Sequence, residues 1–417
     1  MSRVARLWST ERAGGTKEPG SRLAPLIYLV AGEPSGDRLG AALMHALRAE
    51  LPELRFAGLG GREMAAAGLE PLFDIRALSV MGLTEVVPRL PRILGLMKRV
   101  VRDALAAEPD VLVTIDSPSF TLRVARRVRR RRPSLPVVHY VAPSVWAWRP
   151  GRAARMAAHV DHVLALLPFE PPYMEEAGMG CDFVGHPVAE RPAPAPEAGA
   201  RYRAELGLRP GQPLVLMAPG SRPGEVRRLL PLFRRTVEAL AAERPGLAVV
   251  VPLAETVADL VERRLRRMTP RPHFVRPEAG EHQKWLAMAA ADVALVASGT
   301  VVLELAAVGT PMVACYRASP VTAAMVRRML RVKSANLVNL VSDSRVVPEF
   351  YQERARQHLV EPALAELLDD ETARERQRAA MRSVMATLGG GSVPPSARAA
   401  RAVLRVLAAA RAADEDG

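Results

Sequence analysis

Apolar runs of about five residues recur along the chain, and each one leads through small or polar residues into a helical pattern. In the order of the sequence these runs are residues 26–30, 111–115, 137–141, 163–167, 214–218, 247–251, 293–297 and 311–315. They lack the alternation of a strand that faces water on one side, which is typical of parallel strands covered on both faces. The repeated strand–turn–helix pattern predicts an α/β protein with two Rossmann-like domains facing a cleft.

The ends of the two domains follow from composition. We expect an N-terminal domain over residues 26–195 and a C-terminal domain over residues 200–385, joined by the proline- and alanine-rich segment PAPAPEAG. Residues 390–412 predict an alanine-, arginine- and leucine-rich helix that packs back on either domain. Residues 1–25 carry scattered charges and no apolar core, so we interpret them as a disordered extension rather than a signal peptide.

Composition narrows the class of protein. The chain has 417 residues, of which 49% are apolar, so it can bury a sizeable core. Its net charge of +14 favours a negatively charged partner, but only 4% of its residues are aromatic and no nucleic-acid recognition motif is present. Cys181 and Cys315 are too few for a zinc site or a disulfide framework, which favours a reducing cytoplasm. No apolar run reaches the roughly 18 residues that a membrane span needs.

Two turns in the second half are candidate anion sites. The strand at 293–297 runs into Ser298, Gly299 and Thr300 and then into an apolar helix. Backbone N–H groups at a helix start attract anions, although Ser298 is equally typical of a simple N-cap. Arg222 follows another strand in the motif PGSR and is suited to a charge-assisted contact with phosphate.

In the first half, Asp116 directly follows the strand at 111–115. A carboxylate at this end of a parallel strand points into the ligand crevice and can act as a general base, or it can cap the next helix. Farther along, the loop after the strand at 137–141 contains Ser144 and Trp146. Tryptophan in a loop favours a role in binding a ligand or a partner.

Residues 78–101 (LSVMGLTEVVPRLPRILGLMKRVV) are apolar with interspersed basic residues. Pro88 and Pro91 argue against one continuous helix. The segment either packs in the core or forms an apolar patch with basic flanks that lies on an anionic membrane or grips acyl chains. The residues of this candidate patch are Val80, Met81, Leu83, Val86, Leu90 and Ile93.

Several motifs, in this order and spacing, resemble the lipid-A-disaccharide synthase family. They are AGEPSGD (31–37), VMGLTEV (80–86), IDSPSF (115–120), HYVAPSVWAWR (139–149), LPFE (167–170), FVGHP (183–187), PGSR (219–222), ASGTVVLE (297–304), PMVACYR (311–317) and NLVNLV (336–341). The combination of AGEPSGD with HYVAPSVWAWR is the most specific part of the resemblance.

The resemblance implies a glycosyltransferase-B fold and an inverting transfer that needs no metal or cofactor. The family joins UDP-2,3-diacylglucosamine to 2,3-diacylglucosamine 1-phosphate (lipid X), which gives a β-1,6-linked disaccharide and UDP in lipid A biosynthesis. The resemblance also implies a cytoplasmic protein held peripherally on the anionic inner membrane of a Gram-negative bacterium. No nucleic acid is expected as a partner. Members of the family form homodimers with exchanged C-terminal segments.

We assign roles to the matched residues on this basis. Asp116 is the expected catalytic base. The expected UDP and donor contacts are Arg222, Ser298, Gly299, Thr300, Glu304 and Asn339, and the expected acceptor-side residues are Gly32, Glu33, Ser35, Asp37, Ser144 and Trp146. The sequence departs from the family pattern at Ser119, where the family usually has a second Asp, and at Thr121, where it usually has Asn.

Two other functions compete with this interpretation. Phosphate-binding turns serve any UDP-sugar, so another enzyme of the same fold, an epimerase or a peptidoglycan-type glycosyltransferase, fits them too. A non-enzymatic binding protein would account for the charge alone, and it predicts salt-sensitive DNA binding without UDP binding.

Overall fold

The computed structural model describes residues 24–78, 83–146, 151–318, 334–389 and 391–415. The chain forms two compact units. Unit 1 contains the residues up to Pro187 together with those from Leu388 onward, and unit 2 contains Val188–Thr387. The division therefore precedes the predicted linker, and the chain returns to unit 1 at its C-terminal end.

Unit 1 is built on a six-stranded parallel sheet with the order β2-β1-β3-β4-β5-β6. Its strands are β1 (Leu26–Ala31), β2 (Arg55–Leu59), β3 (Val111–Ile115), β4 (Val137–Tyr140), β5 (His162–Ala165) and β6 (Gly180–Phe183). Every residue of β1, β3 and β4 is buried, which explains why these strands appear in the sequence as unbroken apolar runs.

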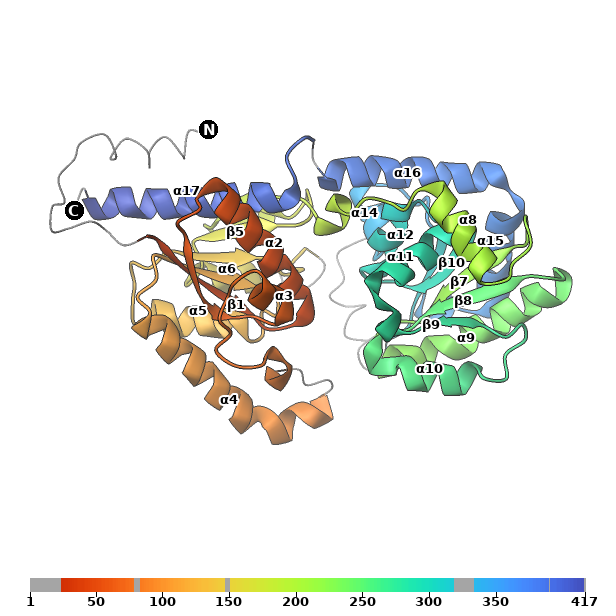
Figure 1. Cartoon of the computed structure of the whole chain (residues 1–417), viewed down its shortest axis with the longest axis horizontal. Coiled ribbons are helices and arrows are strands. Elements are labelled where there is room, and N and C mark those ends of the chain that lie inside the picture. The colour runs from red at the N-terminus through yellow and green to blue at the C-terminus, as the bar shows by residue number, and fades with distance from the viewer. Residues whose placement is uncertain (1–23, 79–82, 147–150, 319–333, 390, 416–417) are drawn as a thin grey trace. The chain divides into compact units, whose positions relative to one another are not determined.

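Helices cover both faces of this sheet (Figure 1). They are α2 (Pro34–Glu50), α3 (Arg62–Ala66), α4 (Leu83–Ala106), α5 (Thr121–Arg129), α6 (Gly151–Ala157), α7 (Pro171–Glu175) and α17 (Pro395–Glu415). One core forms between the sheet and the helices α4 to α7, with Tyr28, Leu112 and Val137 meeting Met97 and Val128.

Unit 2 has its own six-stranded parallel sheet with the order β12-β11-β10-β7-β8-β9. The strands are β7 (Leu214–Ala218), β8 (Ala248–Pro252), β9 (His273–Val275), β10 (Val293–Ala297), β11 (Met312–Tyr316) and β12 (Glu349–Tyr351). The helices are α8 (Pro196–Glu205), α9 (Pro223–Glu243), α10 (Ala258–Leu265), α11 (Gly280–Ala290), α12 (Val301–Val308), α14 (Leu337–Val341), α15 (Gln357–Asp369) and α16 (Glu371–Gly389).

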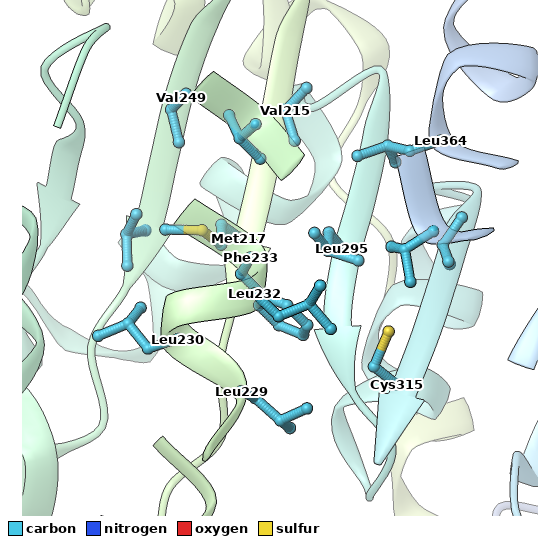
Figure 2. Close-up of a cluster of buried hydrophobic side chains, with 14 of the residues drawn as sticks. Val215, Met217, Leu229, Leu230, Leu232, Phe233, Val249, Leu295, Cys315 and Leu364 are labelled. Atoms are coloured by element: carbon cyan, nitrogen blue, oxygen red, sulfur yellow. The ribbon is translucent and has the colours of Figure 1, made fainter. Parts of the chain in front are cut away.

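The core of unit 2 lies between the sheet and α9, α10 and α15. Figure 2 shows Met217 and Leu295 from the strands meeting Phe233 from α9 and Leu364 from α15. Burying one such side chain contributes about 1.5 to 3 kcal/mol. This packing fixes the strands whose carboxyl ends carry the candidate anion site.

The C-terminal helix α17 packs on α2 of unit 1, and in Figure 1 α2 runs obliquely to it. Val403, Leu404 and Leu407 are at most 3% exposed in this contact. Three arginines of the helix also form ion pairs with unit 1, in the pairs Arg401–Glu50, Arg405–Asp182 and Arg411–Asp110, each at 2.7 Å.

One prediction from the sequence was wrong. Residues 83–106 form a single helix, α4, that contains both Pro88 and Pro91. A proline removes one hydrogen bond but does not have to end a helix, and the buried side chains of Met97, Val100 and Ala104 hold the later turns against the sheet.

The candidate acyl patch falls only partly on described residues. Val80 and Met81 lie outside them, and Leu83, Val86 and Leu90 lie on α4 in a part whose side chains the structure does not describe. Ile93 is half-buried and packs against the core of unit 1. None of the described helices has an apolar stretch long enough to cross a bilayer.

Candidate functional site

The strand order of each sheet reverses at one point, and several of the predicted site residues follow the two strands that flank this point. In unit 1 the reversal separates β1 from β3, which are followed by Gly32–Ser35 and by Asp116. In unit 2 it separates β7 from β10, which are followed by Arg222 and by Ser298. Ligands of open α/β sheets bind at such reversal points, beyond the carboxyl ends of the strands.

Asp116 begins the turn after β3. Its backbone N–H donates to the Tyr140 carbonyl at 2.9 Å, and its carbonyl accepts from the Thr121 hydroxyl at 2.6 Å. The Asp116 carboxylate is half-buried and accepts a hydrogen bond from the Ser35 hydroxyl at 2.9 Å. It does not cap α5, since the N-cap is Phe120 and no side chain caps that helix. The carboxylate is therefore available for chemistry.

The backbone of the turn that carries this carboxylate is strained. Asp116 and Ser117 have φ values of 49° and 40°, in the left-handed region that residues other than glycine rarely adopt. Such conformations cost about 1 to 3 kcal/mol each and cluster at functional sites. Gly32 lets the turn pack closely, because a Cβ there would lie 2.9 Å from the Ser117 Cβ.

Two of the predicted acceptor-side residues, Glu33 and Asp37, lie at the start of α2. Glu33 is the exposed N-cap of α2, without a capping hydrogen bond from its side chain. Asp37 is 5% exposed, and its carboxylate accepts from the N–H groups of Gly61, Glu63 and Met64 at 2.7 to 3.0 Å. Asp37 thus caps α3 rather than its own helix, α2.

His139, on β4, is another ionisable side chain near these strand ends. It is completely buried, and its Nδ1 lies 2.8 Å from the Thr114 hydroxyl. Burial lowers the pKa of His139 to about 3, so the ring is neutral at physiological pH. A residue with no exposed surface does not meet a substrate, which leaves Asp116 as the better candidate base.

The loop after β4 is fixed by a buried carboxylate. Trp146 is 9% exposed and donates from Nε1 to Glu170 Oε1 at 3.1 Å, while its ring meets Phe169 edge to face at 5.0 Å. Glu170 Oε2 accepts from the N–H groups of Leu166 and Leu167. Ser144 is exposed on the same loop. Trp146 therefore anchors the loop, whereas Ser144 is exposed to solvent.

Glu170 gives a pH-dependent prediction. Burial raises the pKa of its carboxyl to about 7, against the three donated hydrogen bonds, which act in the opposite direction. The neutral form is favoured by folding, so the stability it contributes is present below about pH 4.5 and is lost as the pH rises through 7. This change amounts to about 2 to 4 kcal/mol.

Glu170→Gln cannot titrate and loses at least one of the three hydrogen bonds at every pH. Its melting temperature should lie well below that of the wild type at pH 5, and the gap should narrow by pH 8. Differential scanning calorimetry at both pH values measures it. A gap that is independent of pH would exclude a raised pKa at Glu170.

In unit 2, Arg222 is the N-cap of α9 and its side chain is 74% exposed. Its guanidinium donates to Glu225 at 3.1 Å, which leaves most of its donors for a ligand. Gly220 in the same turn has φ +111°, and a Cβ there would lie 2.9 Å from the Glu225 carboxylate. The positive φ of Gly220 therefore favours glycine at this position.

The turn after β10 presents backbone donors. The Ser298 N–H donates to the Cys315 carbonyl at 2.8 Å, and its hydroxyl donates to the Ala335 carbonyl at 3.1 Å. Ser298 therefore does not cap α12, whose N-cap is Thr300. Within the described part of the chain, the N–H groups of Gly299, Thr300 and Val301 donate no hydrogen bond. They are suited to an oxyanion.

Glu304 and Asn339 are both engaged inside unit 2. Glu304 forms an ion pair with Lys284 at 2.8 Å, with about a quarter of each side chain exposed. Asn339 is 2% exposed and bonds through both ends of its amide, to the backbone of Val347 and to the Glu349 carboxylate. Glu304 remains accessible to a ligand, whereas Asn339 supports the fold of its loop.

Sequence reasoning did not assign Lys284, Glu170 or Glu349 a role. Glu170 lies in the quoted motif LPFE, and a buried tryptophan that needs an acceptor is a signal for it. The two buried-looking amides of NLVNLV similarly require a partner, which Glu349 supplies. Nothing in the sequence pattern points to Lys284.

Comparison with known sequences identifies the family. A sequence profile of the family described as lipid-A-disaccharide synthetase matches residues 27–403. The lipid-A-disaccharide synthase of Ruegeria pomeroyi is 48% identical over 91% of this chain and 94% of its own length. That of Rhodospirillum centenum is 46% identical over 94% of this chain and 97% of its own length.

Solved structures show the same fold at low sequence identity. A UDP-GlcNAc 2-epimerase from Neisseria meningitidis bound to UDP-GlcNAc has a TM-score of 0.59 at 11% identity, over 88% of this chain and 99% of that one. A glycosyltransferase of kitacinnamycin has a TM-score of 0.57 at 18% identity, over 92% of this chain and 99% of that one. The fold is thus that of glycosyltransferase-B enzymes and related epimerases, and by sequence the chain belongs to the lipid-A-disaccharide synthetase family.

Proposed function

We propose that the chain transfers 2,3-diacylglucosamine from its UDP derivative to the 6-hydroxyl of 2,3-diacylglucosamine 1-phosphate, with inversion at the anomeric carbon. The observation that carries the proposal is the strand-order reversal in each sheet, where a candidate base follows β3 and candidate anion donors follow β10. Family membership supplies the substrate class.

The base belongs to unit 1. Asp116 takes the proton of the acceptor hydroxyl while that oxygen bonds to the anomeric carbon and the bond from this carbon to UDP breaks. The Ser35 hydrogen bond holds the carboxylate in one orientation, and the Thr121 hydroxyl fixes the backbone of the turn. Thr121 stands where the family usually has Asn, and it supports the turn with its own hydroxyl.

The leaving group belongs to unit 2. Charge develops on the diphosphate as the bond breaks, and fixed donors stabilise it without reorganising. The N–H groups of Gly299, Thr300 and Val301, the α12 dipole and the Arg222 guanidinium are these donors. Glu304 is positioned by Lys284 to accept hydrogen bonds from the ribose hydroxyls.

The direct test is the dependence of UDP release on an acylated acceptor. Purified protein given UDP-2,3-diacylglucosamine and lipid X should release UDP, and omitting lipid X or replacing it by the deacylated sugar phosphate should abolish the release. An epimerase would instead change the configuration of the sugar without an acceptor. Acceptor-independent turnover of the UDP-sugar would overturn the proposal.

Basic residues on unit 1 support a role for an anionic membrane surface. Helices α4 and α5 pack side by side, and each bears exposed basic side chains. These side chains are Arg92, Lys98, Arg99, Arg102, Arg123, Arg126 and Arg130. Each basic residue near an anionic surface contributes about 1 kcal/mol. We propose that this basic face holds the protein peripherally on the cytoplasmic side of the inner membrane.

The charge-reversal variant Arg126→Glu/Arg130→Glu tests the basic face. Its partition coefficient on phosphatidylglycerol vesicles should fall by about thirtyfold or more, the equivalent of about 2 kcal/mol. Arg263→Glu/Arg264→Glu, which makes the same change on exposed residues of α10 in unit 2, is the matched control. Vesicle sedimentation measures both variants, and equal losses would show that net charge alone governs binding.

The family resemblance also suggests a homodimer with exchanged C-terminal segments. The face of α2 that receives α17 of the same chain would receive α17 of the second copy in such a dimer. Light scattering of the purified protein across a range of concentrations tests this proposal, and a monomer at all concentrations would exclude it.

A further inference from the structure

Glu349 is the centre of a polar network beside the candidate anion site of unit 2. It is the first residue of β12, the edge strand that pairs with β11. One carboxylate oxygen accepts from the Ser334 hydroxyl at 2.6 Å and from the Asn339 amide. The other accepts from the N–H groups of Ala335 and Asn336 at 3.2 and 3.1 Å. A single carboxylate thus gathers four donors from one loop.

The network gives the loop one defined conformation. Asn336 is completely buried, and its side-chain oxygen caps α14 by accepting from the Val338 N–H at 2.9 Å. The Tyr351 hydroxyl, also on β12, accepts a second hydrogen bond from the Ala335 N–H at 2.9 Å. The Ala335 carbonyl lies in the same peptide plane as the Asn336 N–H, which donates to Glu349 and to the Ser334 hydroxyl at 3.1 Å each, so these bonds fix the direction of the carbonyl.

The Ala335 carbonyl is what connects the network to the anion site. It accepts the hydrogen bond from the Ser298 hydroxyl at 3.1 Å, and Ser298 is also tied to β11 through its N–H. The next N–H groups in the chain, those of Gly299, Thr300 and Val301, are the donors assigned to the diphosphate. Ser298 directly precedes these donors, and its hydroxyl links the turn to the loop that Glu349 holds.

We propose that Glu349 is a positioning residue that fixes these backbone donors through Ala335 and Ser298. The inference rests on the proposed function, since it assumes that the turn after β10 binds the UDP diphosphate. A carboxylate suits the task because it only accepts hydrogen bonds, and all four groups facing it are donors.

Glu349→Gln tests the proposal. The new amide turns an NH₂ group toward two of the four donors, so at least two hydrogen bonds are lost with little change in volume. UDP affinity should fall about ten- to hundredfold, as expected when one or more hydrogen bonds to a charged group are misplaced. The KM for the donor should rise while the KM for lipid X stays unchanged. Titration calorimetry and initial rates give these values.

Glu238→Gln is the matched control. Glu238 is a half-buried carboxylate of unit 2 that accepts from Arg234 and from the Thr269 N–H on another part of the unit. Both bonds end on one carboxylate oxygen, which an amide retains, so this variant removes a negative charge from unit 2 and should keep its UDP affinity. Equal losses of UDP affinity in both variants would show that Glu349 acts only through the charge of unit 2.

A double-mutant cycle with Ser298→Ala tests whether Glu349 acts through Ser298. If Glu349 acts through the Ser298 hydroxyl, Glu349→Gln should add little to the loss of UDP affinity that Ser298→Ala causes by itself. Fully additive effects would contradict an action of Glu349 through Ser298.

If Glu349→Gln does not fold, Ser334→Ala is the second variant, because it removes one of the four donors. An affinity of Ser334→Ala for UDP equal to that of the wild type would then overturn the proposal.

The result separates this inference from the proposed function. A wild-type protein that fails to bind UDP would remove the proposed function itself. A wild type that binds UDP, together with a Glu349→Gln variant that binds it equally well, would remove only the role of Glu349.

Discussion

Replacing Asp116 by asparagine should lower the rate of UDP release by about two to four orders of magnitude, the usual effect of losing a general base. The substitution keeps the size of the side chain and its ability to accept from Ser35, but it removes the group that takes the proton. The loss should appear in kcat, with the KM for the donor nearly unchanged, because the proposed donor contacts lie in unit 2.

Two other variants serve as comparisons for Asp116→Asn. Asp74→Asn makes the same change at an exposed ion pair of unit 1 and should retain full activity. Ser35→Ala removes one hydrogen bond to the base and should cost about tenfold, the worth of one charge-assisted hydrogen bond. Turnover of Asp116→Asn at the wild-type rate would remove Asp116 from the role of base.

The double variant Val403→Asp/Leu407→Asp in α17 should unfold unit 1. Both side chains are completely buried against unit 1, and burying them contributes about 3 to 6 kcal/mol. Two carboxylates in their place remove this contribution and add the cost of burying charge. Because a domain is typically stable by only about 5 to 15 kcal/mol, the loss is large enough to unfold it.

Hydrogen exchange measured by mass spectrometry locates the effect. Peptides from β1 and β3 should lose protection, while those from β7 and β10 keep it, since α17 packs on unit 1. Arg405→Ala is the control, because a partly exposed ion pair contributes little to stability. Loss of protection in unit 2 alone would show that α17 belongs to the other unit.

The parts of the fold that were predictable from the sequence are those that depend on burial. Residues 111–115 and 293–297 are strands β3 and β10 with the predicted ends, because strands covered on both faces appear as unbroken apolar runs. The turns after them could be named from the sequence as candidate ligand sites, since a parallel sheet gathers the carboxyl ends of its strands at one edge.

Helix α4 shows where local rules fail. Pro88 and Pro91 disfavour a helix, but packing of the later turns against the sheet outweighs their cost. The segment is therefore one helix, and the apolar residues of its second half, including Met97 and Val100, belong to the core.

The partners of polar side chains were the least predictable feature. Ser298 resembles an N-cap by its position before a helix, yet its hydroxyl bonds to Ala335, which lies 37 residues away. Asp37 caps α3 rather than its own helix, and Asn339 faces Glu349. These contacts depend on loops brought together by the sheet, and no local pattern in the sequence specifies them.

The configuration of the product tests the account most directly. Wild-type protein incubated with UDP-2,3-diacylglucosamine and lipid X should yield one UDP for each disaccharide, and NMR of the new anomeric proton should show a β linkage to O6. This is the result of a single displacement in which Asp116 activates the acceptor. An α-linked product, or a UDP-sugar epimerised without any disaccharide, would contradict it.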